Sequence, residues 1–330
     1  MWISLIVLAM LQILSCACGQ RASPELREML HLETAGWAHD ISLDGSKIYV
    51  SDRQGGFLVF DRARNYQRHD PALPVKDVIS LSPNSGMPVL AARFEGLILV
   101  SQSGQITDSY SNGDIANAVE VRGDFAFAAY GLKGLVVARL TRAQVRLAAV
   151  LPTKGWSHDL RISRNQALLA DWDYGLRVVD IHDPEKPVEV SSLPGPGTCI
   201  SLAVKESDGK RILALAEGHG GIALAMLDAE GHPSLISRNY LGLHPTDPIH
   251  PKEGGWVHSV AWAGRYLFAA NWKRGLDVLD TQDSRNPRIV MNMPTAGTAL
   301  GVKAELQQDG SYLIFLADGE SGLRIFRFRY

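Results

Sequence analysis

The sequence predicts an all-β protein, a seven-bladed β-propeller of four-stranded antiparallel blades, on two observations. Short runs rich in Val, Ile and Leu alternate with Gly, Pro, Asn and Asp, a pattern typical of β-strands joined by tight turns. One unit with this pattern recurs seven times at a spacing of roughly 40 to 50 residues, which is typical of propeller blades. We therefore expect one domain over residues 29–330.

The unit is clearest over residues 156–193. Apolar runs at residues 158–162, 167–170, 176–181 and 188–193 predict a four-stranded meander. A glycine precedes the third run of every unit and marks the copies: Gly56, Gly96, Gly134, Gly175, Gly221, Gly275 and Gly322.

The two ends of the chain predict how the ring closes. The last copy stops at Tyr330 without a fourth run, whereas residues 29–36 resemble a fourth strand and precede the first copy. We expect this N-terminal strand to complete the last blade, which would leave no open sheet edge at the seam.

The repeats resemble those of a known family. The stretch GLRVVDIHDPEKPVEV, residues 175–190, is similar to the LVIVD repeat of bacterial and archaeal surface proteins, and GLDVLDTQDSRNPRIV, residues 275–290, is a weaker copy. The resemblance implies a propeller on an exported protein. It carries no established activity, so function has to be argued from the site.

The first 18 residues predict a signal peptide, and residues 19–28 a short linker. The apolar run at residues 1–15 is too short to span a membrane and fits the core of a secretory signal. Residues 13–16 resemble a lipobox, in which Cys16 would be lipidated; plain secretion and an uncleaved anchor are the alternatives. Each places the domain outside the cytoplasm, in the periplasm, at the outer membrane or on the cell surface, as a lipoprotein in the first case.

The net charge limits the kinds of partner that we expect, and the cysteine content limits the disulfides. The net charge of −2 argues against nucleic-acid binding and against a polybasic membrane face, so we expect membrane contact only through an N-terminal lipid anchor. Cys199 is the only cysteine beyond the leader, which excludes an internal disulfide in the domain. We expect Cys199 to be a small buried apolar residue.

One face of the propeller collects the chemistry. The first strand of a meander starts, and the second ends, at the same edge of its blade. The predicted starts of strand one, which should surround the channel mouth, are His39, Asp77, Asn117, His158, Ile200, His258 and Leu300. The predicted ends of strand two all carry a polar group: Asp52, Arg93, Tyr130, Asp171, Glu217, Asn271 and Asp318.

Tryptophans accompany the histidines. Three units start strand one with Trp-x-His, and period-two geometry points both side chains the same way. The residues are Trp37 and His39, Trp156 and His158, and Trp256 and His258; two of these units add Trp172 and Trp272 on the neighbouring loop. They either contact a ligand or pack blade against blade.

A long loop precedes Trp256 on the same face. Residues 242–255 contain His244 and His250 and several prolines, which stiffen the loop. It is either a binding element or a solvated connection.

These features support one leading function and two alternatives. The leading hypothesis is binding of a ligand, glycan or envelope protein, without turnover, through Trp37, His39, Asp52, Trp156, His158, Asp171, Trp172, His244, His250, Trp256, His258, Asn271 and Trp272. One alternative is a metal-dependent enzyme. In it, His39, His158 and His258 would hold Zn, Cu, Fe or Mn, and the catalytic base would be Asp171 or Glu217. The other is a bare scaffold whose face only packs.

Overall fold

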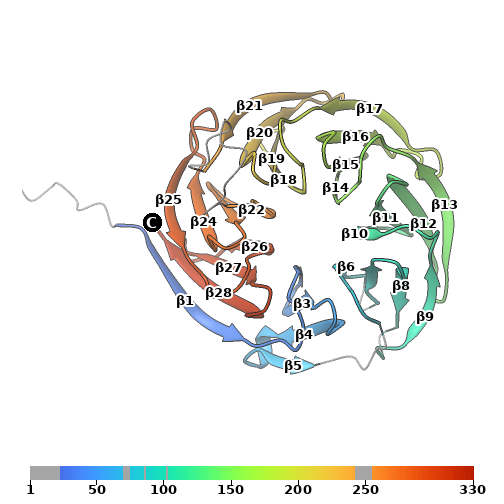
Figure 1. The fold of residues 1–330 in the computed structure, drawn as a ribbon, viewed down its shortest axis with the longest axis horizontal. Helices are drawn as coiled ribbons and strands as arrows, with labels where there is room; N and C mark the ends of the chain where they lie inside the picture. The colour runs from blue at the N-terminus through green and yellow to red at the C-terminus, as the bar shows by residue number, and fades with distance from the viewer. Residues whose placement is uncertain (1–22, 70–74, 85–86, 102, 242–254) are drawn as a thin grey trace, which may run out of the picture.

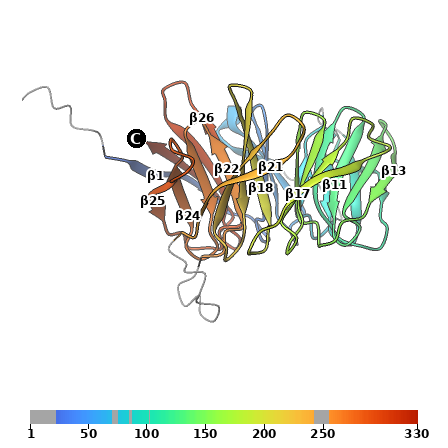
Figure 2. The same ribbon diagram turned by 90° about the horizontal axis from the view of Figure 1, so that it is seen from above.

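The seven-bladed propeller is confirmed by the computed structural model, which describes residues 23–69, 75–84, 87–101, 103–241 and 255–330. The described residues form seven four-stranded antiparallel sheets arranged around a central channel (Figure 1). Seen from the side, the ring is flat (Figure 2). No helix among these residues is long and apolar enough to cross a membrane.

The blades follow one another along the chain. Blade one has β2 (Asp40–Asp44), β3 (Lys47–Ser51), β4 (Phe57–Asp61), the 3-10 turn η1 (Arg62–Arg64) and β5 (Gln67–His69). Blade two has β6 (Ser80–Ser82), β7 (Val89–Ala92), β8 (Gly96–Val100) and β9 (Ile106–Tyr110). Blade three has β10 (Ala116–Arg122), β11 (Phe125–Tyr130), β12 (Leu135–Leu140) and β13 (Val145–Leu151).

The later blades repeat this order. Blade four has β14 (Asp159–Ser163), β15 (Gln166–Ala170), β16 (Leu176–Asp180) and β17 (Val188–Leu193). Blade five has β18 (Ser201–Ser207), β19 (Lys210–Ala216), β20 (Ile222–Leu227) and β21 (Pro233–Asn239). Blade six has β22 (Ser259–Ala263), β23 (Tyr266–Ala270), β24 (Leu276–Asp280) and β25 (Arg288–Met293). Blade seven has β26 (Gly301–Leu306), β27 (Tyr312–Ala317) and β28 (Leu323–Arg329), with β1 (Glu25–Leu32) as its fourth strand.

Ring closure by the N-terminal strand is also confirmed. β1 pairs antiparallel with β28 from Glu25 opposite Arg329 to Leu32 opposite Leu323 (Figure 1). The strand starts at Glu25, so residues 25–28, which were expected to be linker, belong to the blade. The cause is apolar burial, because Leu26 packs into the core with Phe326 and Phe328.

The marker glycines are required by the backbone. All seven have φ between 73° and 84°, in the left-handed region that side chains other than glycine rarely adopt. Each glycine donates or accepts in the tight turn that joins strand two to strand three, for example when Asp171 N donates to Gly175 O over 2.8 Å. This turn returns the chain from the channel mouth.

The core lies between the blades. Seven clusters of buried apolar side chains in the described residues each join two neighbouring sheets, as β15 and β16 of blade four join β19 and β20 of blade five. Cys199 is fully buried in one of them, as expected. Burial also raises the pKa of its thiol well above the ordinary value, which keeps the thiol protonated.

Blade two corrects one expected position. Ile79, and not Asp77, occupies the channel position equivalent to His39, because Ile79 N donates to Ala91 O as His39 N donates to Ser51 O. Asp77 has φ 54° and lies within 3.7 Å of Arg53. The predicted start of strand one in blade two was therefore two residues too early.

Candidate functional site at the channel mouth

The blades are joined to one another at the channel mouth by isolated β-bridges. In the described part of the chain, each blade has a left-handed residue just after strand two that bridges to the next blade just before strand one. The bridges pair Arg53 with Val78, Arg93 with Ala116, Gly131 with Ser157, Trp172 with Cys199, Gly218 with Val257, Trp272 with Ala299, and Gly319 with Ala38. The mouth therefore has seven equivalent junctions.

Each junction carries one large side chain. Where the left-handed residue is glycine, a tryptophan comes from the following blade. An added Cβ on Gly319 would lie 3.1 Å from the indole of Trp37, and one on Gly218 would lie 3.1 Å from that of Trp256. At the third such junction an added Cβ on Gly131 would instead meet the carboxylate of Asp114, and Trp156 directly precedes the bridging Ser157. Where the left-handed residue is large, the following blade has no tryptophan. We call these seven side chains the rim; in order around the ring they are Trp37, Arg53, Arg93, Trp156, Trp172, Trp256 and Trp272.

The four large left-handed residues are conformationally unfavourable. Their φ angles are 41° for Arg53, 42° for Arg93 and 47° for both Trp172 and Trp272. A left-handed backbone costs a residue with a Cβ roughly 1–2 kcal/mol. Glycine occupies the same position at three junctions, so the fold itself does not require these side chains.

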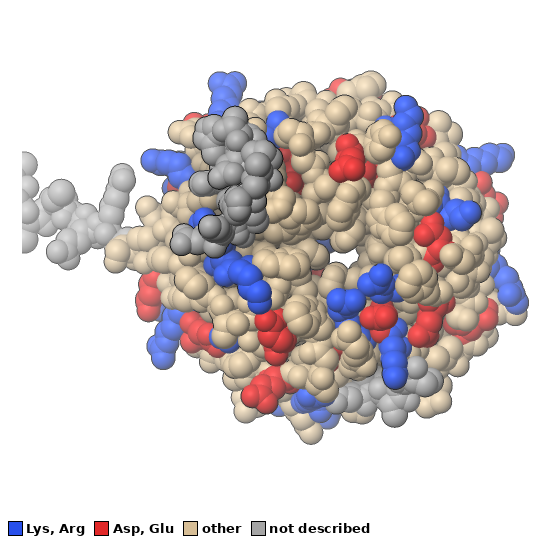
Figure 3. Space-filling model, viewed as in Figure 1, with Lys and Arg blue, Asp and Glu red and all other residues tan. Residues whose placement is uncertain are grey.

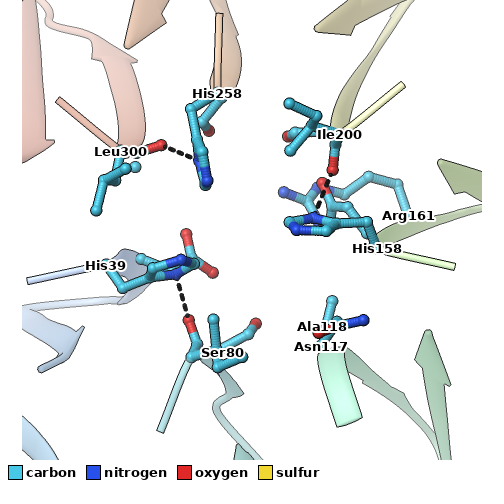
Figure 4. A pocket seen from close by; sticks show the side chains of 15 residues that line it. His39, Ser80, Asn117, Ala118, His158, Arg161, Ile200, His258 and Leu300 are labelled. Atoms are coloured by element: carbon cyan, nitrogen blue, oxygen red, sulfur yellow. Dashed lines mark hydrogen bonds and ion pairs between the residues drawn. The ribbon is translucent and has the colours of Figure 1, made fainter. Parts of the chain in front are cut away.

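Three imidazoles line the channel below the rim. His39 Nδ1 donates to Ile79 O over 3.1 Å, His158 Nδ1 to Ile200 O over 3.0 Å, and His258 Nδ1 to Leu300 O over 2.9 Å (Figure 4). A carbonyl oxygen only accepts, so Nδ1 carries the proton and Nε2 keeps a free lone pair in each ring. All three bonds reach into the next blade and fix the ring orientation.

The imidazoles contact each other across the channel. The ring centroid of His258 lies 5.2 Å from that of His39 and 6.0 Å from that of His158. Burial lowers the pKa of His258 to about 4, and the neighbouring His158 contributes to that shift. Burial also lowers the pKa of His39 well below its ordinary value and lowers that of His158. The neutral form of the cluster is therefore favoured at pH 7.

Two tryptophans of the rim contact histidines. Trp172 lies over His158 with ring centroids 5.6 Å apart, and Trp256 meets His219 edge to face at 4.4 Å. Trp272 is 39% exposed and the other indoles of the rim are half-buried. Trp172 thus joins the rim to the channel imidazoles through His158.

The polar residues at the ends of strand two point away from the channel. Asp52, Asp171, Glu217, Asn271 and Asp318 are buried, and none of them lines the channel cavity. Asp171 accepts hydrogen bonds from Thr153 Oγ1 over 2.6 Å and Ser157 Oγ over 2.9 Å, and it pairs with Arg177. Asp171 therefore holds the connection that leads from β13 of blade three to β14 of blade four.

The proposed catalytic bases are engaged in the same way. Glu217 receives two hydrogen bonds from Arg238, over 2.7 and 3.1 Å. Asp171 also accepts the Gly155 N–H over 3.0 Å. Neither carboxylate faces the three imidazoles.

The arrangement does not form a three-ligand metal centre as it stands. Within the residues that the structure describes, no group of three or more His, Cys, Asp or Glu is placed to hold a metal ion, and this includes His39, His158 and His258. His244, His250 and Cys16 lie outside the described residues.

Two rim residues, Arg53 and Arg93, were not among the predicted binding residues. Arg93 was predicted to end strand two of blade two, but β7 ends at Ala92. Both arginines occupy the position of Trp172 and Trp272, directly after the end of strand two. The sequence shows these arginines and tryptophans at the same position after strand two, but they are different residue types. Alignment by position, and not by residue type, would have found them.

The opposite end of the channel differs in character. It opens into a cavity of about 470 Å³ whose charged lining residues are Asp40, Glu120, Arg161 and Lys303. Arg161 Nη1 lies 2.7 Å from Asp159 Oδ1, and Lys303 Nζ lies 4.0 Å from Asp40 Oδ1. These internal pairs leave the channel mouth as the more available surface.

Solved structures confirm the architecture. The β-propeller domain of Cps50 (Swd1) from Myceliophteria thermophila is similar with a TM-score of 0.71 and 12% identity, over 93% of this chain and 100% of that one. The computationally designed Ika8 protein is similar with a TM-score of 0.63 and 12% identity, over 91% of this chain and 99% of that one. At such low identity the likeness shows the fold alone. No curated protein sequence matches the chain.

The repeats themselves identify the kind of propeller. The LVIVD repeat model matches residues 35–61, 113–138, 154–193 and 254–295. These ranges fall in blades one, three, four and six, and they include all three Trp-x-His segments. The chain is therefore a seven-bladed β-propeller that carries LVIVD repeats.

Proposed function

We propose that the protein binds a ligand or partner across the channel mouth, through the rim and the three imidazoles below it, without turnover of its own. The observation that carries this proposal is the set of four large side chains on left-handed backbone. A feature that lowers stability without serving the fold is typical of a functional site. Exposed indoles also supply large contact area with little conformational entropy to lose.

The test removes the aromatic part of the rim without adding strain. Trp172→Gly and Trp272→Gly, made together in the full chain, delete two indoles at positions where other blades already use glycine. Binding to immobilised oligosaccharides and to solubilised envelope proteins is then compared with the wild type. We expect a partner of the wild type to be lost from the double variant.

Leu147→Ala is the matched control, because Leu147 is 48% exposed on β13, at the outer edge of its blade. Binding that survives both in the Trp172→Gly/Trp272→Gly protein and in a Trp37→Gly/Trp156→Gly protein would refute the proposal and favour the bare scaffold. The three imidazoles are tested separately with a variant in which all are Gln.

We also propose that the protein is exported and tethered by a lipid on Cys16. β1 begins beside Arg329, at the face opposite the channel mouth, and ends beside Leu323, near the mouth. A tether that precedes β1 would therefore leave from the opposite face, and the rim would point away from the membrane. Cys16→Ser should release the protein from the membrane fraction; unchanged membrane association would contradict the lipid anchor.

A further inference from the structure

The rim is divided into a basic and an aromatic part. Arg53 and Arg93 stand at consecutive junctions, between blades one and two and between blades two and three. Trp37 and Trp156 occupy the junctions on either side of them. The space-filling view of this face shows Lys and Arg side chains grouped beside the channel opening (Figure 3). The net charge of −2 therefore conceals a local basic sector.

Arg93 has a guanidinium that the protein leaves free. Across the described residues it makes no ion pair and no side-chain hydrogen bond, and its buried Nε has no hydrogen-bond partner. Its side chain contacts the ring of Phe94, whose centroid lies 5.6 Å from the guanidinium carbon. Phe94 is itself 64% exposed. A guanidinium held this way can still form a bidentate pair with a carboxylate or sulfate.

Arg53 is only loosely engaged. Its one ion pair is with Asp77, at 3.7 Å, and both side chains are about a third exposed or more. An exposed pair of this length contributes little free energy and is easily exchanged for a better acceptor. Arg177, Arg238 and Arg324 behave differently, because each is largely buried against a carboxylate of its own blade.

One carboxylate, Asp77, pairs with Arg53 at 3.7 Å and partly neutralises this sector. Asp52 lies behind Arg53 in blade one, but it is fully buried, and Oδ2 accepts the Gly36 N–H over 2.7 Å. Burial is the main reason for the lowered pKa of His39 and of His158; Arg53 lowers the first further, whereas at His158 the effect of Arg93 is opposed by Asp159. The two guanidinium groups themselves, one loosely paired and one without a hydrogen-bond partner at Nε, are where the mouth can take an anion.

The size of the channel decides where a ligand can lie. The cavity between the three imidazoles has a volume of only about 40 Å³, which is space for a few waters and not for a sugar or aromatic ring. A ring must remain on the rim, where the indoles of Trp37 and Trp156 flank the two guanidinium groups. The flat CH face of a sugar fits an indole, and its acid group fits the arginines.

We propose that Arg53 and Arg93 bind the acid group of an acidic saccharide whose ring lies against the neighbouring indoles of the rim. This inference rests on the proposed function and names its ligand class. Because the contact is local and charged, affinity should fall as salt is added.

The experiment titrates the full-length protein with trigalacturonate, with neutral cellotriose and with benzoate, following intrinsic tryptophan fluorescence. The variants are Arg53→Gln and Arg93→Gln. Arg142→Gln is the control, because Arg142 is exposed in the turn between β12 and β13, away from the channel mouth. Equal melting temperatures would show that the variants fold.

We expect trigalacturonate to bind at least tenfold more tightly than cellotriose. Each rim substitution should weaken it at least tenfold, as expected for loss of a charged hydrogen-bonded pair, while Arg142→Gln should have no effect.

Four outcomes would overturn the inference. Equal affinity for both trisaccharides, lost in Trp172→Gly/Trp272→Gly, would remove the acid specificity and leave the proposed binding function standing. Tight trigalacturonate binding that is unchanged in Arg53→Gln and Arg93→Gln would place the acid group elsewhere. Benzoate binding as tight as that of trigalacturonate would assign the rim to aromatic acids. Absence of binding to all three would also reject the saccharide, and the envelope-protein test would then decide the proposed function separately.

Discussion

Because Trp272 has a left-handed backbone, we predict that its glycine variant is more stable than its alanine variant, the reverse of the usual order. Trp272 has φ 47° and is 39% exposed. Trp272→Ala and Trp272→Gly remove the same indole and lose the same packing, so their difference isolates the backbone. Alanine retains the left-handed penalty of roughly 1–2 kcal/mol, whereas glycine loses about 0.5–1 kcal/mol in chain entropy on folding. We expect the glycine variant to be more stable by about 0.5–1 kcal/mol.

Differential scanning calorimetry or urea unfolding measures this difference. For a domain of this size, 1 kcal/mol corresponds to roughly 1–2 °C in Tm, so replicate scans are needed. Ala143→Gly is the control: Ala143 is exposed and its φ is not positive, so glycine should destabilise there. A Trp272→Ala protein as stable as Trp272→Gly would refute the claim that the rim is strained, and with it the main support for a binding function.

Three further predictions concern stability. Deleting residues 25–32 removes β1 and exposes the edge of β28. We expect the free energy of unfolding to fall by on the order of 5 kcal/mol and the protein to aggregate, which a lower Tm and size-exclusion chromatography would show. An unchanged Tm would contradict closure by β1. Burial raises the pKa of Asp277, so its contribution to stability is present below the unfolded value of 3.8 and is lost as pH rises through the folded pKa. Asp277→Asn should therefore flatten the fall of Tm as pH rises above 3.8, because the amide cannot ionise; a fall as steep as that of the wild type would count against this reasoning. The pKa of His258 is lowered from 6.5 to about 4, so its contribution to stability is complete above pH 6.5 and is lost as pH falls toward 4. Replacing all three channel histidines with Gln should therefore flatten the dependence of Tm on pH over that range. A dependence as steep as that of the wild type would show that other groups control it.

The fold was predictable because its signals are local and repeated. A glycine before each third strand and four short apolar runs per unit fix turn geometry and strand number within a few residues of chain. Closure was also predictable, from one missing strand at the end and one surplus strand at the start. The start of β1 was missed by four residues because the burial of Leu26 depends on Phe326 and Phe328, which lie far away in the sequence.

The site was predictable in part. The Trp-x-His segments indicated which face and which side chains lie at the channel mouth, since strand periodicity alone points them the same way. The polar side chains at the ends of strand two were predicted to lie on the same face, but their hydrogen bonds point them away from the channel. Asp171 and Glu217 show this best, because the partners that bury them, Ser157 and Arg238, come from other strands or loops.

The sequence by itself determined the number of blades, their boundaries, the closing strand and the gathering of tryptophan and histidine on one face, because each of these follows from spacing along the chain. Only the tertiary structure decided which side chains form the rim. A left-handed residue in one blade bridges to the next blade at each junction. The side chain at the junction comes either from the following blade, as a tryptophan, or from the left-handed residue itself, as Arg53, Arg93, Trp172 or Trp272. Which of the two it is depends on two segments that meet only when the ring closes.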